Sequence, residues 1–119
     1  MKFLDKFSPH VHWGLRLSLA ATFLYHGYTK FPIEAGGFMP VPLTWAVALA
    51  ELAGGVFLIA GFWKDIITRL GGLIVVVIMI GAIGMVHWKN GWNVMNGGME
   101  FQVLMLVTGL YFLVKGNKV

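Results

Sequence analysis

Cysteine is absent from this chain of 119 residues, so the chain forms no disulfide and offers no thiolate to a metal ion. Charged residues are scarce at 12%, whereas hydrophobic residues make up 58%. A soluble domain of this length has too small an interior to bury so much apolar surface. The composition therefore predicts an integral membrane protein with a single domain over residues 1–119.

Acidic residues are fewer than basic ones: the chain has five Asp and Glu and nine Lys and Arg, which gives a net charge of +4. The basic residues stand near the ends of apolar stretches and do not form one dense cluster. This distribution bears on orientation in the membrane and on contact with anionic lipid, and it speaks against nucleic acid as a partner.

Four apolar stretches predict four membrane-spanning helices. Pro32 and the Gly36-Gly37 pair end the first stretch, and Pro40 and Pro42 introduce the second. Short connections favour antiparallel neighbours, so we expect an all-α membrane protein built as a four-transmembrane-helix antiparallel bundle. The expected helices are roughly 12–31, 43–62, 66–88 and 99–114.

The basic residues also predict orientation. One end of the expected bundle carries six of them and the other end only Lys30 and Lys89. Because loops rich in Lys and Arg stay on the inner side, both termini are expected in the cytoplasm. The six are Lys2, Lys6, Lys64, Arg69, Lys115 and Lys118.

Glu51 lies near the middle of the second apolar stretch, where a carboxylate is costly unless it has a partner. Gly54 and Gly55 follow on the same side of the helix and predict close approach of a neighbouring helix. Glu51 is either part of a functional site or a hydrogen-bonded group that only holds helices together. We expect it to be ionised and paired with Arg16 of the first helix.

The predicted topology gathers polar residues in one layer near the outer face, with Glu51 just below it. Lys30 follows His26 by four residues, so the two share a helix face. Such residues are not tolerated against lipid and should line the bundle interior or its mouth. The predicted binding or proton-exchange residues are His26, Lys30, Glu51, His87, Asn90 and Glu100.

Several chemistries suit this layer. Imidazole, ammonium and carboxylate groups fit proton exchange with a quinone head group, and they also fit binding of a small anion. His26 and His87 could ligate a haem, and a soft Cu(I) ion could use thioethers and imidazole. The methionines are better explained as packing residues, so no metal site is predicted. A purely structural polar network is the other alternative. The Cu(I) candidates are Met85, His87, Met95 and Met99.

Combinations of these residues resemble the DoxX-like family of small membrane proteins. The resemblance rests on an Arg, then a His-Gly pair and a Lys in the first helix, on Ala-Glu-Leu-Ala-Gly-Gly in the second, and on motifs near the fourth. Arg69 is displaced from the position usual in that family and receives no shared role. The matching residues are Arg16, His26-Gly27, Lys30, 50–55, His87, Asn90-Gly91 and 97–100.

The resemblance implies a bacterial inner-membrane protein with four helices, often linked to redox work, and one relative is the membrane subunit of a thiosulfate:quinone oxidoreductase. We therefore expect a subunit that binds a quinone or similar small molecule in the outer half of the bundle and serves a partner protein or a second copy. The alternative is a non-catalytic anchor or assembly subunit of a larger complex.

Overall fold

A computed structural model describes residues 1–119, and all of its regular elements are helical. Each of the four apolar stretches coincides with a long helix, although the third is shorter than predicted and continues as a π-helical segment. The long helices are α2 (His12–Thr29), α3 (Val41–Ala60), α4 (Asp65–Ala82) and α5 (Glu100–Lys115). The short elements are α1 (Lys2–Asp5), 3₁₀ turns at Ser8–His10, Gly61–Trp63, Trp88–Asn90 and Val94–Asn96, and the π segment Ile83–His87.

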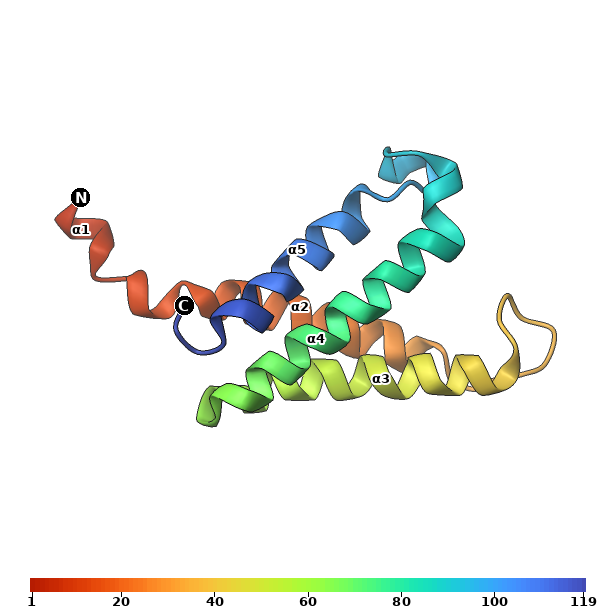
Figure 1. Cartoon of the computed structure of the whole chain (residues 1–119), viewed down its shortest axis with the longest axis horizontal. Coiled ribbons are helices and arrows are strands. Elements are labelled where there is room, and N and C mark those ends of the chain that lie inside the picture. The colour runs from red at the N-terminus through yellow and green to blue at the C-terminus, as the bar shows by residue number, and fades with distance from the viewer.

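The long helices form two hairpins, α2–α3 and α4–α5, which converge at one end and diverge at the other (Figure 1). Contacts run from α2 to α3, from α3 to α4 and from α4 to α5, whereas α2 and α5 barely touch. Both termini lie at the converging end, and the α2–α3 connection and the loop after α4 lie at the diverging end. The arrangement is two antiparallel helical hairpins that pack together at one end only.

Proline and a tight turn set the helix boundaries on either side of α3. Pro40 is the N-cap of α3 and Pro42 stands in its first turn, where the missing N–H removes no helical hydrogen bond. At the other end, Gly61–Trp63 forms a 3₁₀ turn and Lys64 is extended, so α4 reverses direction immediately.

Two of the helical stretches, Val41–Trp63 and Asp65–Asn90, are long and apolar enough to cross a membrane. The other two fall short, since α5 has 16 residues and α2 contains the polar residues His12, Arg16 and His26. The outward faces of the four helices are nevertheless mainly apolar, as lipid contact requires. Examples of exposed residues are Leu17, Leu49, Val56, Val77, Ile80, Leu104 and Val107.

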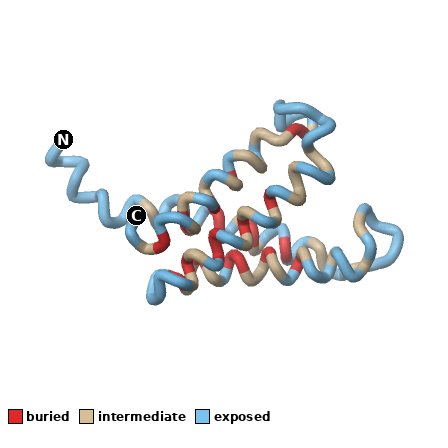
Figure 2. The backbone as a smooth tube through the Cα atoms, in the orientation of Figure 1, coloured by how far each residue is buried: buried red, intermediate tan, exposed pale blue.

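Only 21 of the 119 residues are buried, and they concentrate where the hairpins converge (Figure 2). The largest enclosed apolar side chains include Phe23 on α2, Leu58 on α3, Val75 on α4 and Phe112 on α5. Each long helix therefore contributes to one small core, and the diverging half has room for a cavity.

Glycines allow the helices to approach closely. A Cβ on Gly54 would lie 2.9 Å from Ile74 Cγ2, and one on Gly55 would lie 2.7 Å from Leu24 Cγ, which confirms that both mark close contacts. Gly81 and Gly84 are different, because a Cβ at either position would meet no atom within 4 Å.

Candidate functional site

Arg16 does not pair with Glu51, so the predicted ion pair is wrong. The Arg16 side chain is buried, and its Nη1 donates to the Leu58 carbonyl at 2.5 Å and to Thr68 Oγ1 at 2.9 Å. The antiparallel register explains the difference. It sets Arg16 beside Leu58, which is seven residues, or about 10 Å, farther along α3 than Glu51.

The C-terminal tail completes the surroundings of Arg16. Asn117 Oδ1 accepts hydrogen bonds from Arg16 Nη2 at 3.1 Å and from Thr68 Oγ1 at 2.6 Å, and Asn117 Nδ2 donates to the Gly61 carbonyl at 2.7 Å. We call Arg16, Gly61, Thr68 and Asn117 the terminal clasp. It holds the guanidinium with carbonyl, hydroxyl and amide oxygens, and it joins α2, the α3–α4 turn, α4 and the tail.

Arg69, which the sequence left without a role, braces the same end of the molecule. Its Nε donates to Asp65 at 2.7 Å, and its Nη1 donates to the Leu113 and Val114 carbonyls at 3.1 and 2.8 Å. These carbonyls belong to the last turn of α5, which lacks helical donors for them. Arg69 therefore caps α5 and ties it to α4.

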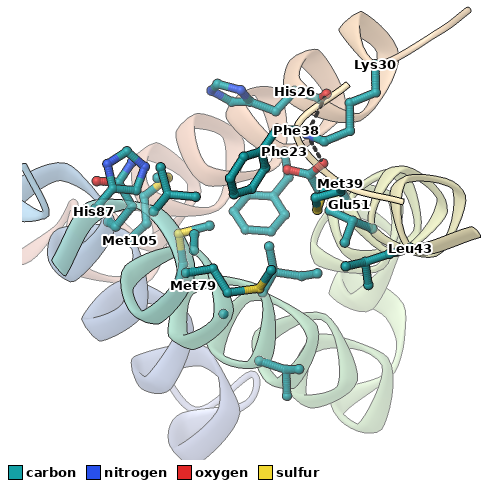
Figure 3. A pocket seen from close by; sticks show the side chains of 18 residues that line it. Phe23, His26, Lys30, Phe38, Met39, Leu43, Glu51, Met79, His87 and Met105 are labelled. Atoms are coloured by element: carbon teal, nitrogen blue, oxygen red, sulfur yellow. Dashed lines mark hydrogen bonds and ion pairs between the residues drawn. The ribbon is translucent and has the colours of Figure 1, made fainter. Parts of the chain in front are cut away.

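A cavity of about 400 Å³ lies between the hairpins in their diverging half. Residues of all four long helices, of the π segment and of the α2–α3 connection line it (Figure 3). Four of the six predicted binding residues line this cavity, whose wall is mainly apolar. Its polar members are His26, Lys30, Glu51, His87 and Gln102, and its larger apolar members include Phe23, Phe38, Met39, Met79, Met85 and Met105.

Lys30 and Glu51 form an ion pair on one side of the cavity. Lys30 Nζ lies 2.5 Å from Glu51 Oε1 and also donates to the His26 carbonyl at 3.3 Å. The Glu51 side chain is 6% exposed and that of Lys30 is 25% exposed. Lys30 stands at the C-cap of α2, from which its long side chain reaches back to the middle of α3. The ammonium compensates a carboxylate that would otherwise be buried alone.

His87 occupies the opposite side of the cavity, with Phe23 and Met79 drawn between it and the ion pair (Figure 3). It is the last residue of the π segment, and its Nδ1 lies 2.7 Å from the Gly97 carbonyl. Asn90 Nδ2 donates to the same carbonyl at 3.2 Å. The loop after α4 therefore fixes the imidazole ring.

Asn90 and Glu100 do not line the cavity, although the sequence predicted them beside the histidines. Asn90 Nδ2 donates to the backbone carbonyls of Val86 in the π segment and Gly97 in the loop. Glu100 Oε1 accepts a hydrogen bond from the Val94 amide at 2.6 Å and closes the loop onto the start of α5. Both residues order the segment that holds His87.

Metal-binding arrangements are not assembled in the cavity. No three His, Asp or Glu side chains lie together. His26 is exposed on α2, and His87 ends the π segment. Of the predicted Cu(I) candidates, Met85 and His87 line the cavity, whereas Met95 is exposed.

Gln102 is a cavity residue that the sequence analysis missed. Its Oε1 is enclosed and has no hydrogen-bond donor within the chain. The available signal was a lone amide in an otherwise apolar stretch of α5, two residues after Glu100. The aromatic and thioether residues of the wall gave no such signal, since they look like ordinary core residues in a sequence.

The family model described as DoxX matches residues 12–88, which include the four predicted residues of the cavity wall. The chain belongs to the DoxX family. It is 30% identical to "Putative oxidoreductase CatD" of Bacillus subtilis (strain 168), over 87% of this chain and 78% of that protein. It is also 30% identical to an uncharacterized protein of Haemophilus influenzae (strain ATCC 51907 / DSM 11121 / KW20 / Rd), over 98% of this chain and 90% of the relative. No solved structure matches the chain.

Proposed function

We propose that this DoxX-family protein is a membrane subunit of a redox system and that its cavity binds a quinone or a similar small molecule. The observation that carries the proposal is the cavity itself, which is mainly apolar and has an ion pair on one side and an imidazole on the other. An apolar pocket with a few convergent polar groups is the usual form of a small-molecule site. The name of the Bacillus relative supports redox work.

Proton exchange is the part of quinone chemistry that the cavity residues would perform. A quinone takes up two protons when it is reduced by two electrons, and His87 and the Lys30–Glu51 pair are the groups available for that exchange. The chain contains no cysteine that could form a thiol redox couple. We therefore propose that a partner subunit, or a second copy in a larger assembly, delivers or removes the electrons.

The proposed setting is the bacterial inner membrane, with all four long helices spanning it and both termini in the cytoplasm. The apolar outward faces and the six-to-two distribution of basic residues support this orientation. The cavity would then lie in the outer half of the bilayer, remote from the termini.

A cavity-filling variant tests the binding function. Val47 lines the cavity and Val56 lies on the same helix with an exposed side chain, so Val47→Trp and Val56→Trp form a matched pair. The probe is a benzoquinone with a ten-carbon tail, titrated into the full chain in lipid nanodiscs. We expect saturable binding by the native chain and by Val56→Trp, and its loss in Val47→Trp.

The rival function is a non-catalytic anchor or assembly subunit, and the terminal clasp is the observation that favours it. The clasp is a nearly complete hydrogen-bond network, as a purely structural device would be. Absence of saturable binding by the native chain would favour this rival. A native mass spectrum from mild detergent would show a retained small molecule in the first case and only partner subunits in the second.

A further inference from the structure

We infer that the cavity selects the reduced, hydroxyl-bearing form of its ligand, an aromatic diol, over the oxidised quinone. This inference rests on the proposed function and adds the redox state that the site prefers. It follows from the hydrogen-bonding direction of the groups on the wall, because a diol donates hydrogen bonds through its hydroxyl groups whereas a quinone only accepts them.

His87 sets this direction on its side of the cavity. Its Nδ1 lies 2.7 Å from the Gly97 carbonyl, which can only accept, so Nδ1 carries the hydrogen. In the neutral ring Nε2 is then unprotonated and accepts hydrogen bonds. Nε2 has no donor within the chain. Asn90 donates to the same carbonyl and so helps to hold the ring as a positioning residue.

Gln102 and Glu51 also present hydrogen-bond acceptors to the cavity. Gln102 Oε1 is enclosed and has no donor, and Glu51 Oε1 meets only the Lys30 ammonium. Lys30 itself is already engaged by Glu51 and by the His26 carbonyl. Gln102 also carries amide hydrogens and so does not decide the direction alone, whereas His87 and the Glu51 carboxylate are acceptors. The enclosed Gln102 Oε1 has no donor, which is costly, and a ligand hydroxyl group would relieve that cost.

The apolar part of the wall indicates an aromatic body for the ligand. Phe23 is buried on α2 and is drawn between His87 and the Lys30–Glu51 pair in Figure 3, so it lies where the body of a ligand bridging the two polar sides would pack. Met79 and Met105 line the same cavity, and thioether sulfur atoms make favourable contacts with aromatic rings. An aromatic diol matches both the acceptors at its edges and the apolar wall along its faces.

The test compares three ligands that share one ten-carbon tail: the hydroquinone, the quinone and the hydroquinone dimethyl ether. The dimethyl ether keeps the ring and cannot donate. Equilibrium dialysis with the full chain in nanodiscs, at pH 8 and without oxygen, gives the three dissociation constants. We expect the hydroquinone to bind about tenfold more tightly than either of the others, as one gained hydrogen bond predicts.

Substitutions at position 87 test whether His87 causes the preference for hydroquinone over quinone. His87→Phe keeps a ring but removes the acceptor, so hydroquinone affinity should fall about tenfold while quinone affinity stays within about twofold. His87→Gln restores an acceptor and should restore much of the preference. His10→Phe is the matched control and should leave the ratio unchanged, because His10 is exposed on the Ser8–His10 turn and does not line the cavity.

The outcomes separate this inference from the proposed function. If no ligand binds the native chain, the proposed function itself fails. If hydroquinone, quinone and dimethyl ether bind equally, the site binds such rings but the selectivity is refuted. A preference that survives in His87→Phe would overturn the role given to His87. Should His87→Phe fail to fold, the three-ligand series on the native chain and on His87→Gln still decides.

Discussion

Lys30 Nζ lies 2.5 Å from Glu51 Oε1, and this contact joins the end of α2 to the middle of α3 across the wall of the cavity. The pair replaces the Arg16–Glu51 pair that the sequence suggested. Its two members belong to one hairpin, so the polar side of the cavity forms within α2 and α3 and does not depend on contacts between the hairpins.

Breaking this pair should destabilise the protein. Glu51→Gln leaves the ammonium with only the His26 carbonyl, and Lys30→Met leaves a carboxylate almost enclosed. We expect each change to lower the free energy of unfolding by about 3 kcal/mol, and the double variant to cost clearly less than the sum. Unfolding by sodium dodecyl sulfate, followed by circular dichroism, measures the three values.

A second cycle is the control for this pair. Arg16 binds Leu58, Thr68 and Asn117 and has no contact with Glu51. Arg16→Met and Glu51→Gln should therefore be additive within about 0.5 kcal/mol. Strong coupling between Arg16 and Glu51, or none between Lys30 and Glu51, would contradict the contacts described above.

The tail should contribute to stability through Asn117. Asn117→Ala removes one acceptor from Arg16 and Thr68 and one donor from the Gly61 carbonyl, so we expect a loss of about 1–3 kcal/mol. Asn96→Ala is the matched control, because Asn96 is exposed and its side chain makes no hydrogen bond. Equal melting temperatures for the two variants would show that the tail is not held by its side chain.

Alanine substitutions should distinguish the glycines at helix contacts from the others. A Cβ on Gly72 would lie 2.6 Å from the Gly109 carbonyl oxygen, so Gly72→Ala must push α4 and α5 apart. We expect a loss of about 1–3 kcal/mol from Gly72→Ala. Gly81→Ala should be neutral or slightly stabilising, since its methyl group meets nothing within 4 Å. Thermal unfolding of both variants in the same detergent compares them, and a larger loss from Gly81→Ala would refute the α4–α5 packing.

The native absence of cysteine allows a direct test of orientation. Lys118→Cys reports on the tail, and Met95→Cys reports on the loop after α4, where the Met95 side chain is 86% exposed. With both termini in the cytoplasm, an impermeant maleimide should label intact cells at position 95 and not at position 118. The reverse pattern would move the cavity to the cytoplasmic half of the membrane.

The four helices were predictable because their signals are local. Apolar length predicted each long segment, and Pro42 in the first turn of α3 predicted where that helix begins. The close contacts at Gly54 and Gly55 were also predictable, since small residues beside a buried carboxylate indicate a helix interface.

The sequence did not predict which polar side chains pair with each other, because pairing depends on the register between helices. Depth along a helix placed Arg16 and Glu51 within reach of each other, but the antiparallel register sets Arg16 beside Leu58. Asn90 and Glu100 were misplaced for a related reason. Their partners are backbone groups of the loop, and the course of a loop rich in glycine and asparagine is not encoded in hydropathy.

The terminal clasp has a consequence for how the protein is made. Asn117 is the third residue from the end of this chain, yet its partner Arg16 lies in the first long helix. Because Asn117 follows Arg16 by 101 residues, Arg16 is synthesised long before this partner exists. During translation its guanidinium then needs temporary hydrogen-bond partners, such as water, lipid head groups or the insertion machinery. Closure of the helices at this end thus follows synthesis of the tail.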